Sequence, residues 1–417
     1  MKLRVAFGSA LLAVLTSASG GEIAVLPECP GPSVVVSVGV KQSPVPPAFL
    51  PDDALVTAQG NDFRILLNAV QAGAPGMPSS TRRVALGQLP EGSYQAAVYY
   101  RYELLSGTYL PEQLFGSVRF DVRARAETDG PCPPGVITIE SGGFQRTAVG
   151  TVFAEPIAVE VDDGQLRPVS NVQVRLERVL RPEDPSLTSD QQPGATQNVL
   201  LASTDAHGMA KFNVTANAAS GTYQYKATIG GAAFSPEAYA VLDNREPASQ
   251  SDLPLLPVVE FYNAARNHYF ITQDVAEAQR LDLGLAQGWR RTGAVFLAMP
   301  AGSAVAKSQP VCRFYGLPEA GLDSHFFSVS PVECARVIEQ FGSSWALETA
   351  EAFREFLPDV ATGACAAGTV PLYRAWNNRV DANHRYTLSK WVIASMVSRT
   401  WIPEGYGSSA VAMCVPH

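Results

Sequence analysis

Residues 311–341, VCRFYGLPEAGLDSHFFSVSPVECARVIEQF, contain the pattern from which the structure of the C-terminal part of the chain can be predicted. Two runs of apolar and aromatic residues, separated by turn-forming residues, predict a pair of strands. Ser330-Pro331-Val332-Glu333 then predicts a helix start, because it combines a capping box with proline at the first helical position. The stretch therefore predicts strand, strand and short helix.

The same order of features occurs three times after residue 257. Three tryptophans recur 56 residues apart, at Trp289, Trp345 and Trp401, and three histidines recur at His268, His325 and His384. Each unit opens with an aromatic strand: Val259-Glu260-Phe261-Tyr262-Asn263, Cys312-Arg313-Phe314-Tyr315-Gly316 and Tyr373-Arg374-Ala375-Trp376-Asn377. A repeat of this period predicts units that bury their apolar faces against one another. We expect a pseudo-threefold α+β module, 258–417, with units 258–300, 310–358 and 370–417.

At these residues the segment resembles a bacterial repeat family of unannotated function. Units of that family read aromatic-Tyr-Arg-Phe-Tyr-Asn, then His-Phe-Tyr-Thr, then Gly-Trp-x-x-Glu-Gly. Unit three keeps Glu404-Gly405, unit two keeps Glu348 but has Thr349, and unit one has Thr292-Gly293. Such modules are attached to secreted hydrolases and cell-wall proteins, so the resemblance implies surface attachment or glycan binding.

Two segments upstream of the module show the period-two alternation of half-buried strands. In 22–133 the alternating residues include Val34, Val36 and Val38, and in 134–245 they include Val172, Val174 and Leu176. We expect each segment to form a β-sandwich. The polar, proline-rich range 246–257 predicts a linker before the module.

The second segment also resembles the bacterial immunoglobulin-like domains of invasin and intimin-type surface proteins. The resemblance is carried by five stretches: Thr147-Ala148-Val149-Gly150, Pro156-Ile157-Ala158-Val159, Pro168-Val169-Ser170-Asn171-Val172, Thr204-Asp205-x-x-Gly208 and Gly221-Thr222-Tyr223. In that family these domains are usually spacers or stalks, so the resemblance implies the same role here. The expected fold class is mainly β and multidomain.

The N-terminal residues 1–21 have the three-part pattern of a secretory signal peptide. Lys2 and Arg4 precede an apolar run, which is followed by small residues. The run is too short to span a bilayer, and no later stretch reaches about 18 apolar residues. We therefore expect a secreted or extracytoplasmic protein, in the periplasm or at the cell surface, with no membrane span in the mature chain.

Charge excludes two classes of partner. The 417 residues carry a formal net charge of −8, and the isoelectric point is near 5.3. Binding to nucleic acid or to an anionic membrane requires clustered Lys and Arg, which this balance does not provide. The charge is also uneven, because residues 255–417 carry 13 − 14 = −1 but contain all five tryptophans. The aromatic and nearly neutral module is the segment expected to recognise a partner.

Six cysteines in an exported chain predict disulfides. We expect Cys29 to pair with Cys132 across the ends of the first sandwich, Cys312 with Cys334 inside unit two, and Cys365 with Cys414 inside unit three. Spacing does not determine connectivity, so other pairings stay open.

The candidate binding residues are aromatic and polar groups of the module. Arg, Asn and His supply hydrogen bonds and aromatic rings stack on sugars, so these types suit a glycan site. The set is His268, His325, His384, Arg313, Arg374, Asn383, Trp345 and Trp401. The alternative is that these residues serve the core of each unit. Three histidines at one axis would also suit Zn²⁺, but no pattern of residues that would orient such ligands is visible, and we expect no metal and no cofactor.

No catalytic motif is recognisable in the sequence. A nucleophile elbow, a His-Glu-x-x-His zinc site, a P-loop and a dinucleotide glycine motif are all absent. We expect a non-catalytic binding protein in which a β-sandwich stalk presents the repeat module to a glycan or another cell-envelope component. The alternatives are a structural or adhesive surface protein without a small ligand, and an extracytoplasmic hydrolase.

Overall fold

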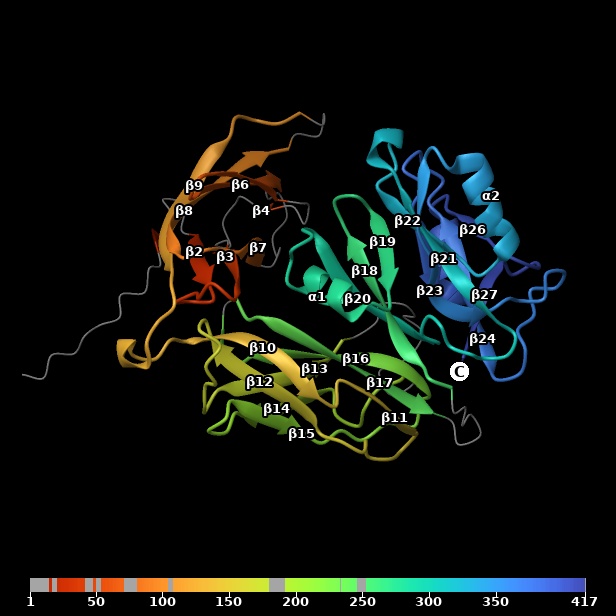
Figure 1. Ribbon diagram of the computed structural model, residues 1–417, viewed down its shortest axis with the longest axis horizontal. Coiled ribbons are helices and arrows are strands. Elements are labelled where there is room, and N and C mark those ends of the chain that lie inside the picture. The colour runs from red at the N-terminus through yellow and green to blue at the C-terminus, as the bar shows by residue number, and fades with distance from the viewer. Residues whose placement is uncertain are drawn as a thin grey trace, which may run out of the picture. The chain divides into compact units, whose positions relative to one another are not determined.

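A computed structural model gives the fold of the chain (Figure 1). It describes the ranges 15–16, 21–41, 48–49, 54–70, 81–103, 108–179, 192–232, 234–245 and 253–416. The chain is mainly β and multidomain, as the sequence predicted. It divides into two compact bodies, the first formed by 1–136, 162–167 and 232–234, and the second by 137–161, 168–231 and 235–417. Of the predicted signal peptide, only residues 15, 16 and 21 are described.

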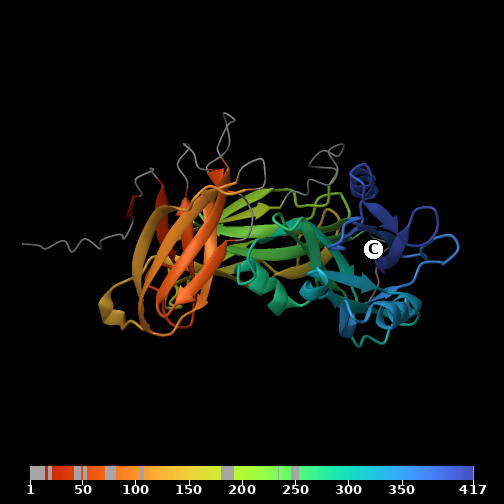
Figure 2. The same cartoon turned by 90° about the horizontal axis from the view of Figure 1, so that it is seen from above.

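The first body contains a sandwich of two sheets, coloured red to orange in Figure 2. One sheet has the order β1 (Leu15–Thr16), β2 (Glu22–Leu26), β3 (Val35–Lys41) and β7 (Thr81–Gln88). The other has the order β4 (Ala48–Phe49), β6 (Asp62–Val70), β8 (Gly92–Tyr102) and β9 (Gln113–Val122), with β5 (Leu55–Gln59) on β6. Side chains of both sheets, including Val38 and Val98, share one core. The single helical turn η1 (Glu127–Asp129) follows β9.

The second body begins with another sandwich. Its smaller sheet has the order β10 (Pro134–Ser141), β12 (Ile157–Asp163) and β15 (Met209–Phe212). Its larger sheet has the order β11 (Phe144–Ala148), β17 (Glu237–Arg245), β16 (Gly221–Ile229), β13 (Gln173–Arg178) and β14 (Val199–Ser203). The core between the sheets includes Val159, Leu176 and Tyr225. Strands β13 and β15 bury every second side chain, which is the pattern visible in the sequence, whereas β12 is buried on both faces.

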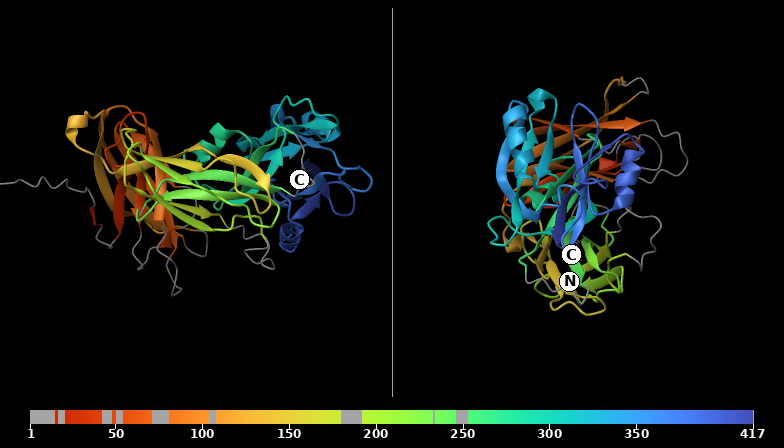
Figure 3. Two further views of the ribbon diagram at one scale, coloured as in Figure 1. Left: turned by 90° about the horizontal axis from the view of Figure 1, so that it is seen from below. Right: turned by 90° about the vertical axis from the view of Figure 1, so that its right-hand side faces the viewer.

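The repeat module completes the second body, and each unit contains a hairpin, a helix and a return strand. Unit one has β18 (Leu256–Asn263), β19 (His268–Thr272), α1 (Val275–Asp282) and β20 (Trp289–Ala298). Unit two has β21 (Ser308–Gly316), η2 (Pro318–Ala320), β22 (Ser324–Ser328), α2 (Pro331–Phe341) and β23 (Trp345–Phe356). Unit three has β24 (Thr369–Trp376), β25 (His384–Thr387), α3 (Lys390–Val397), β26 (Ile402–Glu404) and β27 (Val411–Pro416). Figure 3 shows units two and three in blue.

The three units share one apolar core. Unit one contributes a sheet of order β19-β18-β20, and units two and three join in a sheet of order β22-β21-β23-β27-β24-β25, with β26 on β24. The common cluster takes buried side chains from every unit: Val258, Phe261, Phe270, Val295, Val311, Phe327, Phe353, Leu372, Tyr386 and Met413. No unit can bury its apolar face alone, so the three copies stabilise one another.

All three helices start at a side-chain cap. Asp274, Ser330 and Ser389 each accept a hydrogen bond from the backbone N–H three residues later. The capping box predicted at α2 is only half formed. The Glu333 carboxylate accepts from Ser328 Oγ and from Arg374 rather than from the backbone of Ser330. A buried guanidinium is a stronger partner than a backbone amide, which explains the difference.

Two of the three predicted disulfides are formed. Cys312 is bonded to Cys334, and Cys365 to Cys414. Cys29 and Cys132 are free thiols in the structure, which corrects the third predicted pair. Burial, followed by the contact with Cys132, raises the pKa of Cys29 to about 11.

One carboxyl group lies inside the module without a partner. Glu355 on β23 is fully buried, and neither of its side-chain oxygens has a hydrogen-bond partner among the described residues. It points to the same side of the strand as Phe353, which belongs to the shared core. Burial raises the pKa of Glu355 well above its usual value. The folded module therefore holds this group as the neutral acid.

We predict that Glu355→Gln stabilises the module at neutral pH but not at pH 4. The native state keeps a proton that the unfolded chain releases above a pKa of about 4.3, so Glu355 lowers stability by up to about 1.4 kcal/mol per pH unit above that value. Urea unfolding followed by tryptophan fluorescence measures the difference. The matched control is Glu339→Gln on the exposed part of α2, which should change nothing. An equal effect of Glu355→Gln at both pH values would contradict the prediction.

Candidate functional site

The hairpin registers show which residues of the three units are equivalent. Tyr262 pairs with Tyr269, Tyr315 with His325, and Trp376 with His384. Tyr269 is therefore the counterpart of the two later histidines. His268 lies one position earlier and corresponds to Ser324 and Asn383. The sequence spacing placed three histidines in equivalent positions, and the structure corrects this in unit one.

A second equivalent position lies on each opening strand, where Glu260, Arg313 and Arg374 correspond. The pairing of the opening strand with the return strand shifts register there, as it does in a β-bulge. Bulges turn a side chain toward a new direction. Here they bring the third residue after each tryptophan onto this position. The distances are 2.7 Å for Thr292 Oγ1 to Glu260 Oε2, 2.6 Å for Glu348 Oε2 to Arg313 Nε, and 3.0 Å for Glu404 Oε2 to Arg374 Nε.

The same three residues also connect neighbouring units. Arg313 forms a bidentate pair with Glu277 of α1 at 2.8 and 2.9 Å. Arg374 forms the same pair with Glu333 of α2 at 2.8 and 3.0 Å. Two helices thus each hold the opening strand of the next unit.

The connection between units three and one has the opposite polarity. Val392 of α3 occupies the place of Glu277 and Glu333, so this helix offers no carboxylate. Instead, Glu260 on the opening strand of unit one accepts two hydrogen bonds from Arg385 of unit three, both 3.0 Å long. Three guanidinium–carboxylate pairs therefore close the ring of units, which we call the inter-unit bridges.

The two later histidines add to these bridges. His325 Nε2 lies 3.3 Å from Glu348 Oε2, and His384 Nε2 lies 3.3 Å from Glu404 Oε2. Burial lowers the pKa of His384 and outweighs the opposing contact with Glu404. Burial also opposes ionisation of Glu348, but His325 and Arg313 outweigh it and lower the pKa of this carboxyl. The arrangement keeps the carboxylates charged and paired.

His268 and Asn383 lie where the three hairpins meet. Asn383 Nδ2 donates to Ser324 Oγ at 3.0 Å and to the Tyr269 carbonyl at 2.9 Å. His268 contacts the Asp323 carbonyl through Nδ1, and its Nε2 lies 3.1 Å from Asp381. The three histidines consequently do not converge. Within the described ranges, no group of three or more His, Cys, Asp or Glu side chains is placed to hold a metal ion.

The two tryptophans of the predicted site pack against rings of the module. Trp345 meets Phe326 edge to face with ring centroids 6.1 Å apart, and Trp401, which is buried, meets Tyr269 in the same way at 6.1 Å. All eight predicted binding residues thus have partners inside the module. Their arrangement accounts for cohesion between units, and it leaves their ligand-binding role a prediction.

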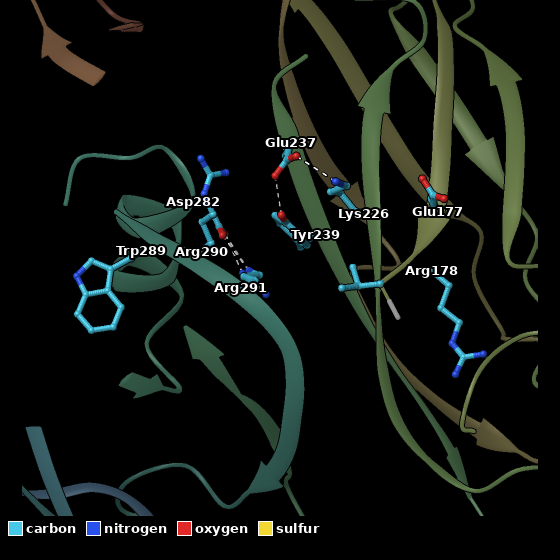
Figure 4. Close-up of a pocket in the computed structure, with 10 residues that line it drawn as sticks. Glu177, Arg178, Lys226, Glu237, Tyr239, Asp282, Trp289, Arg290 and Arg291 are labelled. Carbon is cyan, nitrogen blue, oxygen red and sulfur yellow. Dashed lines mark hydrogen bonds and ion pairs between the residues drawn. The ribbon is translucent and has the colours of Figure 1, made fainter. Parts of the chain in front are cut away.

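A different part of the second body is hollowed. A pocket of about 430 Å³ lies between the larger sheet of the second sandwich and unit one (Figure 4). Lys226 of β16, with Glu237 and Tyr239 of β17, forms one wall, and Asp282, Arg290 and Arg291 form the other. The rest of the lining is Glu177, Arg178, Val179 and Trp289.

Ion pairs set the geometry of the two pocket walls. Lys226 Nζ lies 3.1 Å from Glu237 Oε1, and the Tyr239 hydroxyl donates to the other oxygen of the same carboxylate at 2.6 Å. Arg291 forms a bidentate pair with Asp282 at 2.8 and 2.9 Å, and its guanidinium lies 4.5 Å from the centre of the Tyr239 ring. Both walls are therefore held in place without a ligand.

Further hydrogen bonds join the sandwich to unit one beside the pocket. Arg291 Nη1 donates to Gln224 Oε1 at 3.0 Å, and Thr222 Oγ1 donates to the Val295 carbonyl at 2.9 Å. The sequence predicted a linker over 246–257 between these parts, of which 246–252 lie outside the described residues, and β18 begins at Leu256. Sequence reasoning missed this pocket because its residues come from both segments. The only local feature of the sequence that could have indicated the pocket was the pair of adjacent arginines, Arg290-Arg291, after Trp289.

Comparisons with known proteins give a family match over part of the second body. A family model described as Domain of unknown function (DUF5648) matches residues 233–354. The match includes β17, α1 and β20, which carry most of the pocket, and it ends in the return strand of unit two. Among solved structures, the chain is similar to one titled D0-D1 domain of Intimin, with 16% identity over 51% of this chain and 90% of that chain and a TM-score of 0.21. A search of the curated proteins found no match.

We predict that reversing the charge of one partner of an inter-unit bridge destabilises the module. Reversing the charges of both partners should restore most of the lost stability. Arg385→Glu places two carboxylates together in a buried site, where loss of one partner costs about 3–5 kcal/mol. The double variant Glu260→Arg/Arg385→Glu re-forms an opposite pair and should recover at least half of that loss. Urea unfolding followed by tryptophan fluorescence measures the three proteins.

Arg336→Glu provides the control for this charge-reversal series. Arg336 is exposed on α2, so its reversal should change stability by less than about 0.5 kcal/mol. A double variant no more stable than Arg385→Glu alone would show that the bridge does not hold units one and three together.

Proposed function

We propose that this chain is an extracytoplasmic, non-catalytic binding protein that recognises a glycan of the cell envelope. The observation that carries the proposal is the pocket between the second sandwich and unit one. It is preformed, its walls are fixed by ion pairs, and it offers polar groups of both charges together with a tyrosine. Polar groups placed around a preformed concave site are the usual means of fixing a ligand's orientation.

The extracytoplasmic location is supported by covalent chemistry. Two disulfides staple units two and three, and disulfides persist in oxidising compartments. The signal-peptide pattern of residues 1–21 favours the same location. None of the helices that the structure describes is long and apolar enough to cross a membrane.

The pocket favours saccharide over an apolar ligand. Lys226, Glu237 and the Tyr239 hydroxyl form a connected polar wall, and such groups exchange hydrogen bonds with sugar hydroxyls. Overall negative charge argues against a polyanionic ligand such as nucleic acid. A neutral or weakly charged glycan offers hydroxyl groups to the polar wall and is not repelled by the negative charge of the chain.

We predict that the double variant Lys226→Ala/Glu237→Ala loses glycan binding at least about tenfold, because it removes a connected hydrogen-bonding pair without changing net charge. A glycan array that includes cell-wall fragments, probed with the full chain, identifies the bound sugar. Titration of that sugar into wild type and variant then gives the loss.

The matched control is Arg64→Ala/Glu112→Ala, which removes another exposed ion pair of similar accessibility in the first body. It should bind like wild type. Absence of binding to every glycan and cell-wall fragment would favour a structural or adhesive surface protein without a small ligand. Release of reducing sugar or of peptide from a bound polymer would identify a hydrolase instead.

A further inference from the structure

The pocket walls differ in how their charges are compensated. Glu177 is paired with Arg175, Glu237 with Lys226, and Asp282 with Arg291. Arg178 is buried and has partners of its own. Every other ionised group of the lining is thus compensated within the protein.

Arg290 is the exception within the described lining. Its side chain is exposed, and no hydrogen bond or ion pair joins it to another described residue. It follows Trp289 on β20 and precedes Arg291, whose bidentate pair with Asp282 holds this part of the strand. An uncompensated guanidinium therefore stands on a wall whose neighbouring groups are already paired (Figure 4).

We infer that this pocket recognises a saccharide with one acidic substituent and that Arg290 binds that substituent. This inference rests on the proposed function, because it assigns the ligand class of the same pocket. A guanidinium presents a planar fork of donors that matches the two oxygens of a carboxylate and also suits a sulfate ester. Hydrogen-bonding groups for the sugar hydroxyls stand on the opposite wall, at Lys226, Glu237 and Tyr239.

The charge of the chain limits the ligand to a low charge density. A protein of net charge −8 disfavours close approach of a polyanion, which brings many negative charges within the Debye length of about 8–10 Å, whereas one acidic group close to Arg290 gains the local pair. The acidic carboxylates of the pocket wall add to this selection, because a second anionic group would meet Glu237 or Asp282. A saccharide with a single acidic substituent meets both conditions.

The experiment uses the full chain with matched sugars. Cellobiouronic acid, cellobiose and a singly sulfated cellobiose are titrated by calorimetry, together with any acidic glycan that an array identifies and the neutral form of that glycan. We expect an acidic member of a pair to bind at least about tenfold more tightly than its neutral form, because a bidentate charge-assisted pair is added. The carboxylated and sulfated arms distinguish the two sources of the acidic group.

Variants of Arg290 separate this inference from the proposed function. Arg290→Ala should reduce the preference for the acidic sugar over its neutral form to less than about twofold, and Arg290→Lys should retain part of the preference. Arg336→Ala, an exposed arginine on α2, is the control and should retain all of it.

Three outcomes would overturn the inference. Equal affinity for acidic and neutral sugars, or a preference unchanged in Arg290→Ala, would refute it while leaving glycan binding at the pocket intact. Absence of binding to any glycan would overturn both the inference and the proposed function.

Discussion

The guanidinium–carboxylate bridges between repeat units are the interaction on which the module depends. Three copies of a hairpin, a helix and a return strand leave apolar faces that only the other copies can cover. Burial alone favours contact but does not fix which surfaces meet. A bidentate pair does fix them, because both its atoms and its plane must match. Arg313 with Glu277 and Arg374 with Glu333 therefore set the order and angle of consecutive units.

The bridge between units three and one, Glu260 with Arg385, has its charges in the opposite order from the other two, and this determines which units are first and last in the ring. If all three bridges were identical, any unit could follow any other, including a unit of a second chain. Between units, Glu260 accepts from the arginine of unit three, whereas Arg313 and Arg374 donate to glutamates of the preceding helices. A misplaced unit would bury like charges against each other, which costs several kcal/mol. The departure of unit one from the repeat motif thus has a structural reason.

The sequence predicted more of the fold than of the site. Period-two alternation and the recurrence of Trp289, Trp345 and Trp401 indicated strands and repeated units, because both are local patterns. Equivalence of the histidines was wrong in unit one, because Tyr269 occupies the position of His325 and His384 and only the pairing register reveals this. The role of Glu333 was also misjudged, since Arg374, its partner, is 41 residues away.

The pocket could not be predicted because it depends on a packing between domains. Its two walls come from strands of the sandwich and from α1 and β20, and no motif in either segment records that they face each other. Polar contacts hold the two walls in place, because Arg291 donates hydrogen bonds to Asp282 within unit one and to Gln224 within the sandwich. A flexible stalk would place a binding module at a distance and leave the site to the module alone. Here the sandwich supplies Lys226, Glu237 and Tyr239, so it forms one wall of the pocket.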